Sequence, residues 1–261
     1  MKRILFSTWL LLFLLPLYSQ EVVTPFSGLA GSEVSLHSAW STYYNQAGLA
    51  RIDGFSLGSS YRHVADVQEL SLKTIFAAYP IGMGAFAANF TYFGYEHYNE
   101  QSLGVAYAKQ LSPHLDVGIK GNYRKTAVAK QKEYSESLFF ELGTIITFSD
   151  AVHLGVHASN PLSVGSEGVP EVYNAGISWQ ADKLFLLAGS AQMMDREISF
   201  SMGTEFNYTD RLQFSCGLRT SPQRFYAGVS VLIMPRLDIS LQYNTNDALG
   251  NVFGVSISWI K

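Results

Sequence analysis

The chain has 261 residues, of which 48% are hydrophobic, 14% aromatic and 15% charged, and its formal net charge is −3. This charge argues against a nucleic-acid partner, for which a basic surface is expected. The single cysteine, Cys216, excludes an internal disulfide, and its place on an apolar strand face indicates a small hydrophobe and not a reactive thiol.

The first segment has the order of a secretory signal peptide. Lys2 and Arg3 precede an apolar run from Ile4 to Tyr18, and Ser19 supplies a small residue. We expect residues 1–19 to be removed. The alternative, a membrane anchor, is less favoured because a spanning helix needs about 20 apolar residues. Polar residues interrupt every later apolar run, so a purely helical membrane protein is excluded.

Residues 20–54 do not alternate in polarity and are expected to form an N-terminal plug or hatch. The middle of this segment, residues 38–50, is compatible with a short helix or a tight loop.

From Phe55 onward, apolar and polar residues alternate with a period of two. In residues 235–244, Leu237, Ile239 and Leu241 share one face while Asp238 and Ser240 share the other. Similar runs occur at 55–63, 68–79, 84–95, 101–110, 114–126, 134–148, 151–158, 171–180, 183–192, 197–208, 211–219, 224–234, 236–244 and 251–260. The pattern predicts an all-β class, a transmembrane antiparallel β-barrel of about fourteen strands over residues 55–261.

Two kinds of connection alternate along the barrel. Short turns are expected at 80–84, 111–114, 149–151, 181–183, 209–211 and 234–236. Longer, more polar loops are expected at 94–101, 126–136, 159–171 and 244–251. In bacterial outer-membrane barrels the short turns are periplasmic and the long loops face outward.

The two faces of the strands differ in composition. Aromatic residues gather on the apolar face, as a membrane interface requires, for example Phe253 and Trp259 in the last strand. The polar face is rich in Gly, Ser and Ala, which suits a narrow, crowded lumen. A soluble β-sandwich is the less favoured alternative, because its polar face usually carries many Lys, Glu and Thr.

Charged residues of both signs are expected on the inward face. These are Lys73, Asp116, Lys120, Arg124, Glu141, Glu205, Arg219 and Asp238. Because buried charges must be paired, a network that braces the lumen is favoured over a solute pathway. Lys120 and Glu141 lie on neighbouring strands and are expected to pair.

No motif predicts catalysis, so we expect a non-enzymatic protein without a cofactor. His153 and His157 share the inward face at a spacing that suits a metal, but packing in a polar lumen is favoured for both. Apolar residues expected inward would either line a solute route or pack against the plug: Ile75, Phe139, Ile145, Phe185, Leu187 and Leu232.

The plug carries a short motif, formed by Asn45, Gln46, Ala47, Gly48, Leu49 and Ala50. It resembles the "NPAGLA" element of the PorV/PorQ family of Bacteroidetes outer-membrane barrels, except that Gln46 replaces proline. That family is similar to the long-chain fatty-acid transporter barrels, in which an N-terminal segment plugs fourteen strands. Asn45 and Gly48, which suit a tight turn, are retained.

The resemblance implies an integral outer-membrane protein, in contact with lipid, that acts as a partner or anchor in protein secretion or surface attachment of the type IX system. A protein partner is therefore expected. The alternative is a transporter of hydrophobic solutes, with a hydrophobic ligand. A membrane lipase is a third and weaker hypothesis, because no activated nucleophile lies beside a base.

Overall fold

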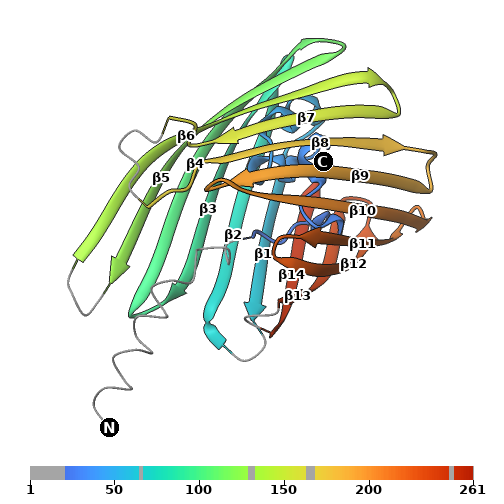
Figure 1. Cartoon of the computed structure of the whole chain (residues 1–261). Helices are drawn as coiled ribbons and strands as arrows, with labels where there is room; N and C mark the ends of the chain where they lie inside the picture. The colour runs from blue at the N-terminus through green and yellow to red at the C-terminus, as the bar shows by residue number, and fades with distance from the viewer. Residues whose placement is uncertain (1–20, 65–66, 129–132, 163–167, 247–249, 261) are drawn as a thin grey trace.

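The computed structural model describes residues 21–64, 67–128, 133–162, 168–246 and 250–260. Within these residues, fourteen antiparallel strands form a closed ring in which each strand pairs with its sequence neighbours and β1 pairs with β14 (Figure 1). The strands are β1 Ser56–Val64, β2 Val67–Ile81, β3 Gly84–Tyr95, β4 Tyr98–Ser112, β5 Leu115–Val128, β6 Glu133–Ser149, β7 Val152–Ser159, β8 Val172–Gln180, β9 Phe185–Met194, β10 Glu197–Thr209, β11 Leu212–Thr220, β12 Gln223–Met234, β13 Leu237–Asn246 and β14 Gly250–Ile260. The predicted all-β barrel of fourteen strands is confirmed.

The expected signal peptide, residues 1–19, lies outside the described residues. Among the residues that are described, no helix has the length and apolar character needed to cross a membrane.

The two ends of the ring are named here by their connections. The base is the end at which β1 begins and β14 ends, together with the turns that follow β2, β4, β6, β8, β10 and β12. The mouth is the opposite end.

Three of the four connections predicted to be long loops at the mouth are largely strand. Strands β3 and β4 pair as far as Tyr95 and Tyr98, so only Glu96 and His97 connect them. Strand β5 likewise continues to Val128, and β13 to Asn246. The polar residues there indicated loops, but backbone pairing continues where the strands bear polar side chains. The connection from β7 to β8 keeps its predicted length.

The outer face of the ring is apolar. Its exposed side chains include Ile177, Trp179, Ile198, Phe200, Met202, Tyr208, Phe253, Ile257 and Trp259. Cys216 is also exposed on this face. Phe253, Trp259 and Cys216 match the outward assignments made from the alternation, and such a surface suits lipid.

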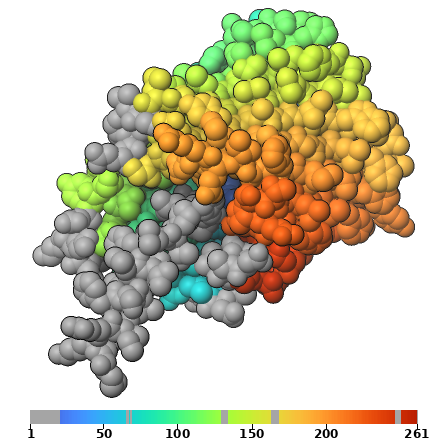
Figure 2. Space-filling view, in the orientation of Figure 1, coloured from blue at the N-terminus to red at the C-terminus, as the bar shows by residue number. Residues whose placement is uncertain are grey.

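The plug, residues 21–55, passes through the ring before β1 begins. It contains four short 3₁₀ helices, η1 Ser27–Leu29, η2 Glu33–Ser35, η3 Ala39–Tyr43 and η4 Gln46–Arg51. The side chain of Ser38 caps η3 by accepting from the Trp40 amide at 3.1 Å, and Asn45 caps η4. In the space-filling view of Figure 2, a small blue area is all that shows of this segment.

The core of the molecule lies between the plug and the inner face of the ring. Trp40 and Leu49 pack against Phe76 and a group of small wall residues. The group consists of Ala78, Ala85, Ala87, Ala106 and Ala108. The small inward residues therefore leave room for the plug, and the lumen is filled by apolar contact as well as by polar groups.

Glycine is required where plug backbone approaches the wall. At Gly203 of β10, an added Cβ would lie 2.6 Å from the Cα of Leu29 and 2.9 Å from its carbonyl oxygen. Backbone cannot yield as a flexible side chain can, so the plug would have to shift.

The substitution Gly203→Ala is therefore expected to destabilise the protein by about 1–3 kcal/mol through overpacking. Thermal unfolding in detergent, followed by circular dichroism, measures the loss. Gly189→Ala on neighbouring β9 is the matched control, because its Cβ would meet only the Ser201 carbonyl oxygen, at 3.7 Å. Equal melting temperatures for the two variants would contradict close packing of the plug.

Candidate functional site

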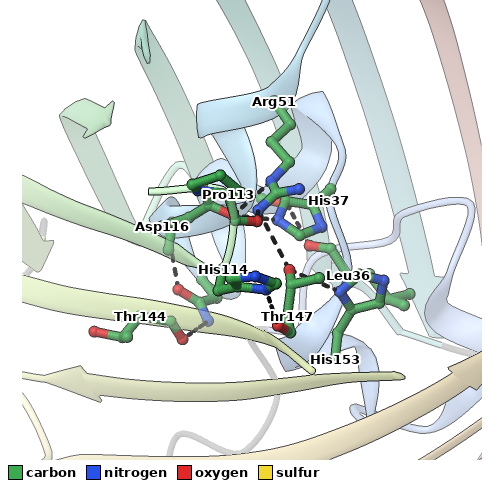
Figure 3. A network of polar contacts seen from close by, with 12 residues as sticks. Leu36, His37, Arg51, Pro113, His114, Asp116, Thr144, Thr147 and His153 are labelled. Atoms are coloured by element: carbon green, nitrogen blue, oxygen red, sulfur yellow. Dashed lines mark hydrogen bonds and ion pairs between the residues drawn. The ribbon is translucent and has the colours of Figure 1, made fainter. Parts of the chain in front are cut away.

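Three polar networks join the plug to the wall at different heights. The base network consists of His37, Arg51, His114, Asp116, Thr147 and His153 (Figure 3). The central network consists of Thr42, Gln46, Lys120, Asn122, Glu141 and His157. The mouth network consists of Glu21, Arg62, Arg219, Arg224 and Tyr226.

Asp116 is the centre of the base network. It is fully buried, and its Oδ2 accepts from Nε of Arg51 at 2.7 Å and lies 2.9 Å from Nε2 of His37. Arg51 also donates to the carbonyl oxygen of Pro113 at 2.7 Å. One wall carboxylate thus holds the plug at two points fourteen residues apart in sequence, and a buried charge is paired.

Histidines surround Thr147 at the base. Nδ1 of His114 lies 3.0 Å from the Thr147 carbonyl oxygen, and Nδ1 of His153 lies 3.2 Å from its hydroxyl. His157 belongs to the central network instead, so the two inward histidines of β7 have different partners. Within the described part of the chain, no three His, Cys, Asp or Glu residues are grouped to hold a metal.

Glu141 is the centre of the central network. Its carboxylate accepts from Nδ2 of Asn122 at 2.8 Å and lies 3.3 Å from Nζ of Lys120 and 3.1 Å from Nε2 of His157. Nε2 of Gln46, on the plug, also donates to it. Nζ of Lys120 in turn donates to the plug carbonyl of Thr42 at 2.9 Å. The ion pair expected between Lys120 and Glu141 is thus present, and each of its two residues also bonds to the plug.

The plug motif lies at this height, and all six of its residues are buried. Nδ2 of Asn45 donates to the Val34 carbonyl oxygen at 2.7 Å and to that of Thr144 on β6 at 3.2 Å. Asn45 therefore joins two parts of the plug to the wall. Gln46 stands where the PorV/PorQ family usually has proline, and its side chain makes a bond to Glu141 that proline cannot make.

The mouth network gathers three arginines around one carboxylate. Glu21 pairs through Oε1 with Arg219 and, at 3.5 Å, with Nη1 of Arg224. The hydroxyl of Tyr226 donates to its Oε2 at 3.0 Å. Burial raises the pKa of Glu21, but the three arginine charges outweigh burial and hold that pKa below its ordinary value.

Four of the predicted charges remain, and their surroundings differ. Arg124 faces inward, with Nη1 4.0 Å from Glu100. Glu205 is buried, and Asp238 accepts from the Ser240 hydroxyl at 2.9 Å. The assignment of Lys73 to the lumen is wrong, because Lys73 is exposed on the outer face with Nζ 5.7 Å from the Tyr92 ring centroid.

The error at Lys73 has a physical cause in the plug. Phe76 faces inward because Trp40 provides an apolar partner there, with ring centroids 4.7 Å apart. Strand β2 therefore bears large apolar residues on both faces, and its polarity does not reveal which face is inside.

The same cause affects the expected apolar route. Ile75, Phe185 and Leu187 are exposed on the outer face, so their predicted inward placement is wrong. On β9 it is Leu186 that packs inward, against Leu29 of the plug. Ile145, Phe139 and Leu232 do face the lumen, opposite inward residues of their neighbouring strands.

Several residues of the networks were not predicted from the sequence. The acidic and basic ones are Glu21, His37, Arg51, Arg62, His114 and Arg224. Arg62 and Arg224 alternate in phase with inward neighbours, so a fuller count of each strand would have found them. The three plug residues lie in a segment without periodicity and give no such signal.

Two cavities of about 270 Å³ each lie on the mouth side of the plug and share Glu21, Gln192 and Arg219. The first reaches Arg124 on β5 and Ser199 on β10. The second extends inward to residues of the plug and the central network: Tyr43, Tyr44, Glu141 and His157. We call these cavities together the vestibule.

Comparisons with known proteins identify the fold of the chain but do not assign it to a family. No protein-family model and no curated protein matches the chain. Among solved structures, the CymD monoaromatic hydrocarbon channel has a TM-score of 0.71 at 13% identity and covers 90% of this chain and 96% of its own. The Ralstonia pickettii toluene transporter TbuX has a TM-score of 0.70 at 12% identity, with 92% and 98% covered.

A Pseudomonas aeruginosa FadL homologue has a TM-score of 0.67 at 12% identity, with 91% of this chain and 98% of that chain covered. At these identities the fold is shared, and the chain is an outer-membrane-type β-barrel that resembles such channels. The PorV/PorQ resemblance is not shown by these comparisons.

The contacts of the central network predict how a substitution at Glu141 changes the free energy of unfolding. Glu141→Gln leaves Lys120 buried beside a neutral amide, and loss of one partner of a buried pair costs about 3–5 kcal/mol. Urea unfolding in detergent measures the change. Glu136→Gln, at an exposed position on the same strand, is the control and is expected to change stability by less than about 0.5 kcal/mol. Similar midpoints for both variants would show that the network does not hold the plug.

Proposed function

We propose that this protein is an outer-membrane channel for small hydrophobic or amphipathic solutes, and that its plug shifts to let them pass. The observation that carries the proposal is the vestibule, which leads from the mouth to Tyr43 and Tyr44 on the plug. Tyr43, Tyr44 and Tyr226 line its inner part beside polar and charged residues such as Glu141 and Arg219, so the vestibule offers apolar contact together with polar groups. The hydrocarbon channels that share the fold support this choice over a secretion role.

Passage requires movement of the plug. The described strands form a closed ring around the plug, so a solute that moves from the vestibule toward the base has to pass along the plug. Below the vestibule, Trp40 and Leu49 pack against the wall without space for a solute. The polar contacts of the central network therefore have to open during transport.

A reversible tether between plug and wall tests this mechanism. The Thr42 hydroxyl lies 3.3 Å from Oδ1 of Asn89 on β3, so the two side chains are in contact and their positions are chosen for an engineered disulfide. The double variant Thr42→Cys/Asn89→Cys is made with Cys216→Ser. Uptake of labelled toluene and of a labelled fatty acid into cells is then measured in oxidised and reduced states.

We expect the oxidised tether to lower uptake to the level of cells that lack the protein, and reduction to restore it. The single variant Thr42→Cys with Cys216→Ser controls for the redox treatment. Uptake that is equal in cells with and without the protein would overturn the transport proposal. Uptake that is unaffected by the closed tether would overturn plug movement.

A second function, the partner or anchor role in secretion or surface attachment, is favoured by one observation. The motif at residues 45–50 is wholly buried and fixes the plug to β6, which suits a barrel that is permanently closed. Co-purification in mild detergent tests it. A partner recovered in stoichiometric amount supports this role, and recovery of the barrel alone with normal secretion in a deletion strain argues against it.

A further inference from the structure

The mouth network holds more positive charge than its acids neutralise. Arg62, Arg219 and Arg224 face one carboxylate, that of Glu21. Glu33 of the plug also interacts with Arg219, but burial raises its pKa to about 7, so it is only partly ionised near neutral pH. At least one guanidinium charge therefore remains without a counter-charge in a buried setting, which is costly.

Arg62 is the arginine left without a full set of partners. Its side chain is 4% exposed, and its Nε and Nη2 have no hydrogen-bond partner among the described residues. Arg224 is 5% exposed, and its Nε also has no hydrogen-bond partner among the described residues. Buried donors of this kind are normally satisfied, so these atoms indicate a site for an acceptor.

The shape of the Glu21 carboxylate explains why it leaves Arg62 unsatisfied. Its Oε1 serves Arg219 and Arg224, and its Oε2 accepts from Tyr226. The roughly four lone-pair sites of a carboxylate all lie in one plane, and in this arrangement neither Nε nor Nη2 of Arg62 bonds to either oxygen. A tetrahedral oxyanion presents oxygens in more directions, and guanidinium pairs well with phosphate oxygens.

The small volume of the nearby cavity limits how such an anion can enter. The cavity beside Arg62 and Tyr226 measures about 20 Å³, which is room for a water molecule and too little for an added phosphate. Glu21 itself borders this cavity and both parts of the vestibule. An anion that arrives in the vestibule meets Arg219 directly, but it can contact Arg62 as well only by replacing the Glu21 carboxylate.

We propose that the mouth network is a binding site for a phosphate group, either inorganic phosphate or the phosphate monoester of a larger solute, and that Glu21 is its built-in competitor. When Glu21 moves aside, three guanidinium groups and the Tyr226 hydroxyl face one dianion. The proposal concerns binding at the mouth and does not depend on transport across the membrane.

Isothermal titration calorimetry on the full chain in detergent, in a phosphate-free buffer, tests the site with inorganic phosphate and with glycerol 3-phosphate. Glu21→Gln removes the competitor and is expected to tighten phosphate binding roughly tenfold or more. Arg62→Gln removes the unsatisfied guanidinium and is expected to weaken binding roughly tenfold. Lys73→Gln, on the outer face, is the matched control and should bind as the unaltered chain does.

The two ligands distinguish the sources of the phosphate. Binding of inorganic phosphate alone assigns the site to the free ion, and equal binding of glycerol 3-phosphate assigns it to a phosphorylated solute. Absence of binding in both the unaltered chain and Glu21→Gln would overturn the proposal. So would weaker binding in Glu21→Gln, or unchanged binding in a folded Arg62→Gln. If uptake fails while this binding persists, only the transport proposal is lost.

Discussion

Closure of the wall is the constraint on which the rest of the structure depends. A ring of fourteen strands has an interior too wide for short side chains to fill, and its inner face is largely Gly, Ala and Ser. The chain supplies the missing core from its own N-terminal segment. Trp40 and Leu49 take the place that long inward side chains occupy in a narrower barrel. The wall and the plug therefore form one core.

Charge ties these two parts more closely than apolar contact alone. Each network joins at least one charged wall residue to the plug, through Asp116 at the base, Glu141 at the centre and Arg219 at the mouth. Removal of the plug would take both ion-pair partners, His37 and Arg51, from buried Asp116 and would leave Arg219 without Glu21. The bracing inferred from the sequence therefore runs both directly from strand to strand, as between Lys120 and Glu141, and through the plug.

Alternation of polarity was enough to predict the fold, because lipid on one side and a lumen on the other impose a period of two on every strand. It failed where the plug offers an apolar neighbour inside, which reversed the assignment of Lys73 and Ile75. Alternation also could not identify Glu21, because a segment of short 3₁₀ turns has no periodicity from which its contacts can be predicted. The phosphate site proposed for the mouth joins a strand residue such as Arg62 to that segment, and only three-dimensional placement brings them together.

The path of the plug restricts the ways in which the pore can open. Glu21 lies at the mouth and Arg51 at the base, and an unbroken ring surrounds the chain between them. A lid that covers one opening can swing aside on a hinge, but an encircled chain cannot. It can clear a passage only by sliding along the axis or by changing its own coil inside the ring. Because the ring encloses the plug, the pairing of β1 with β14 closes the wall around a segment of the same chain.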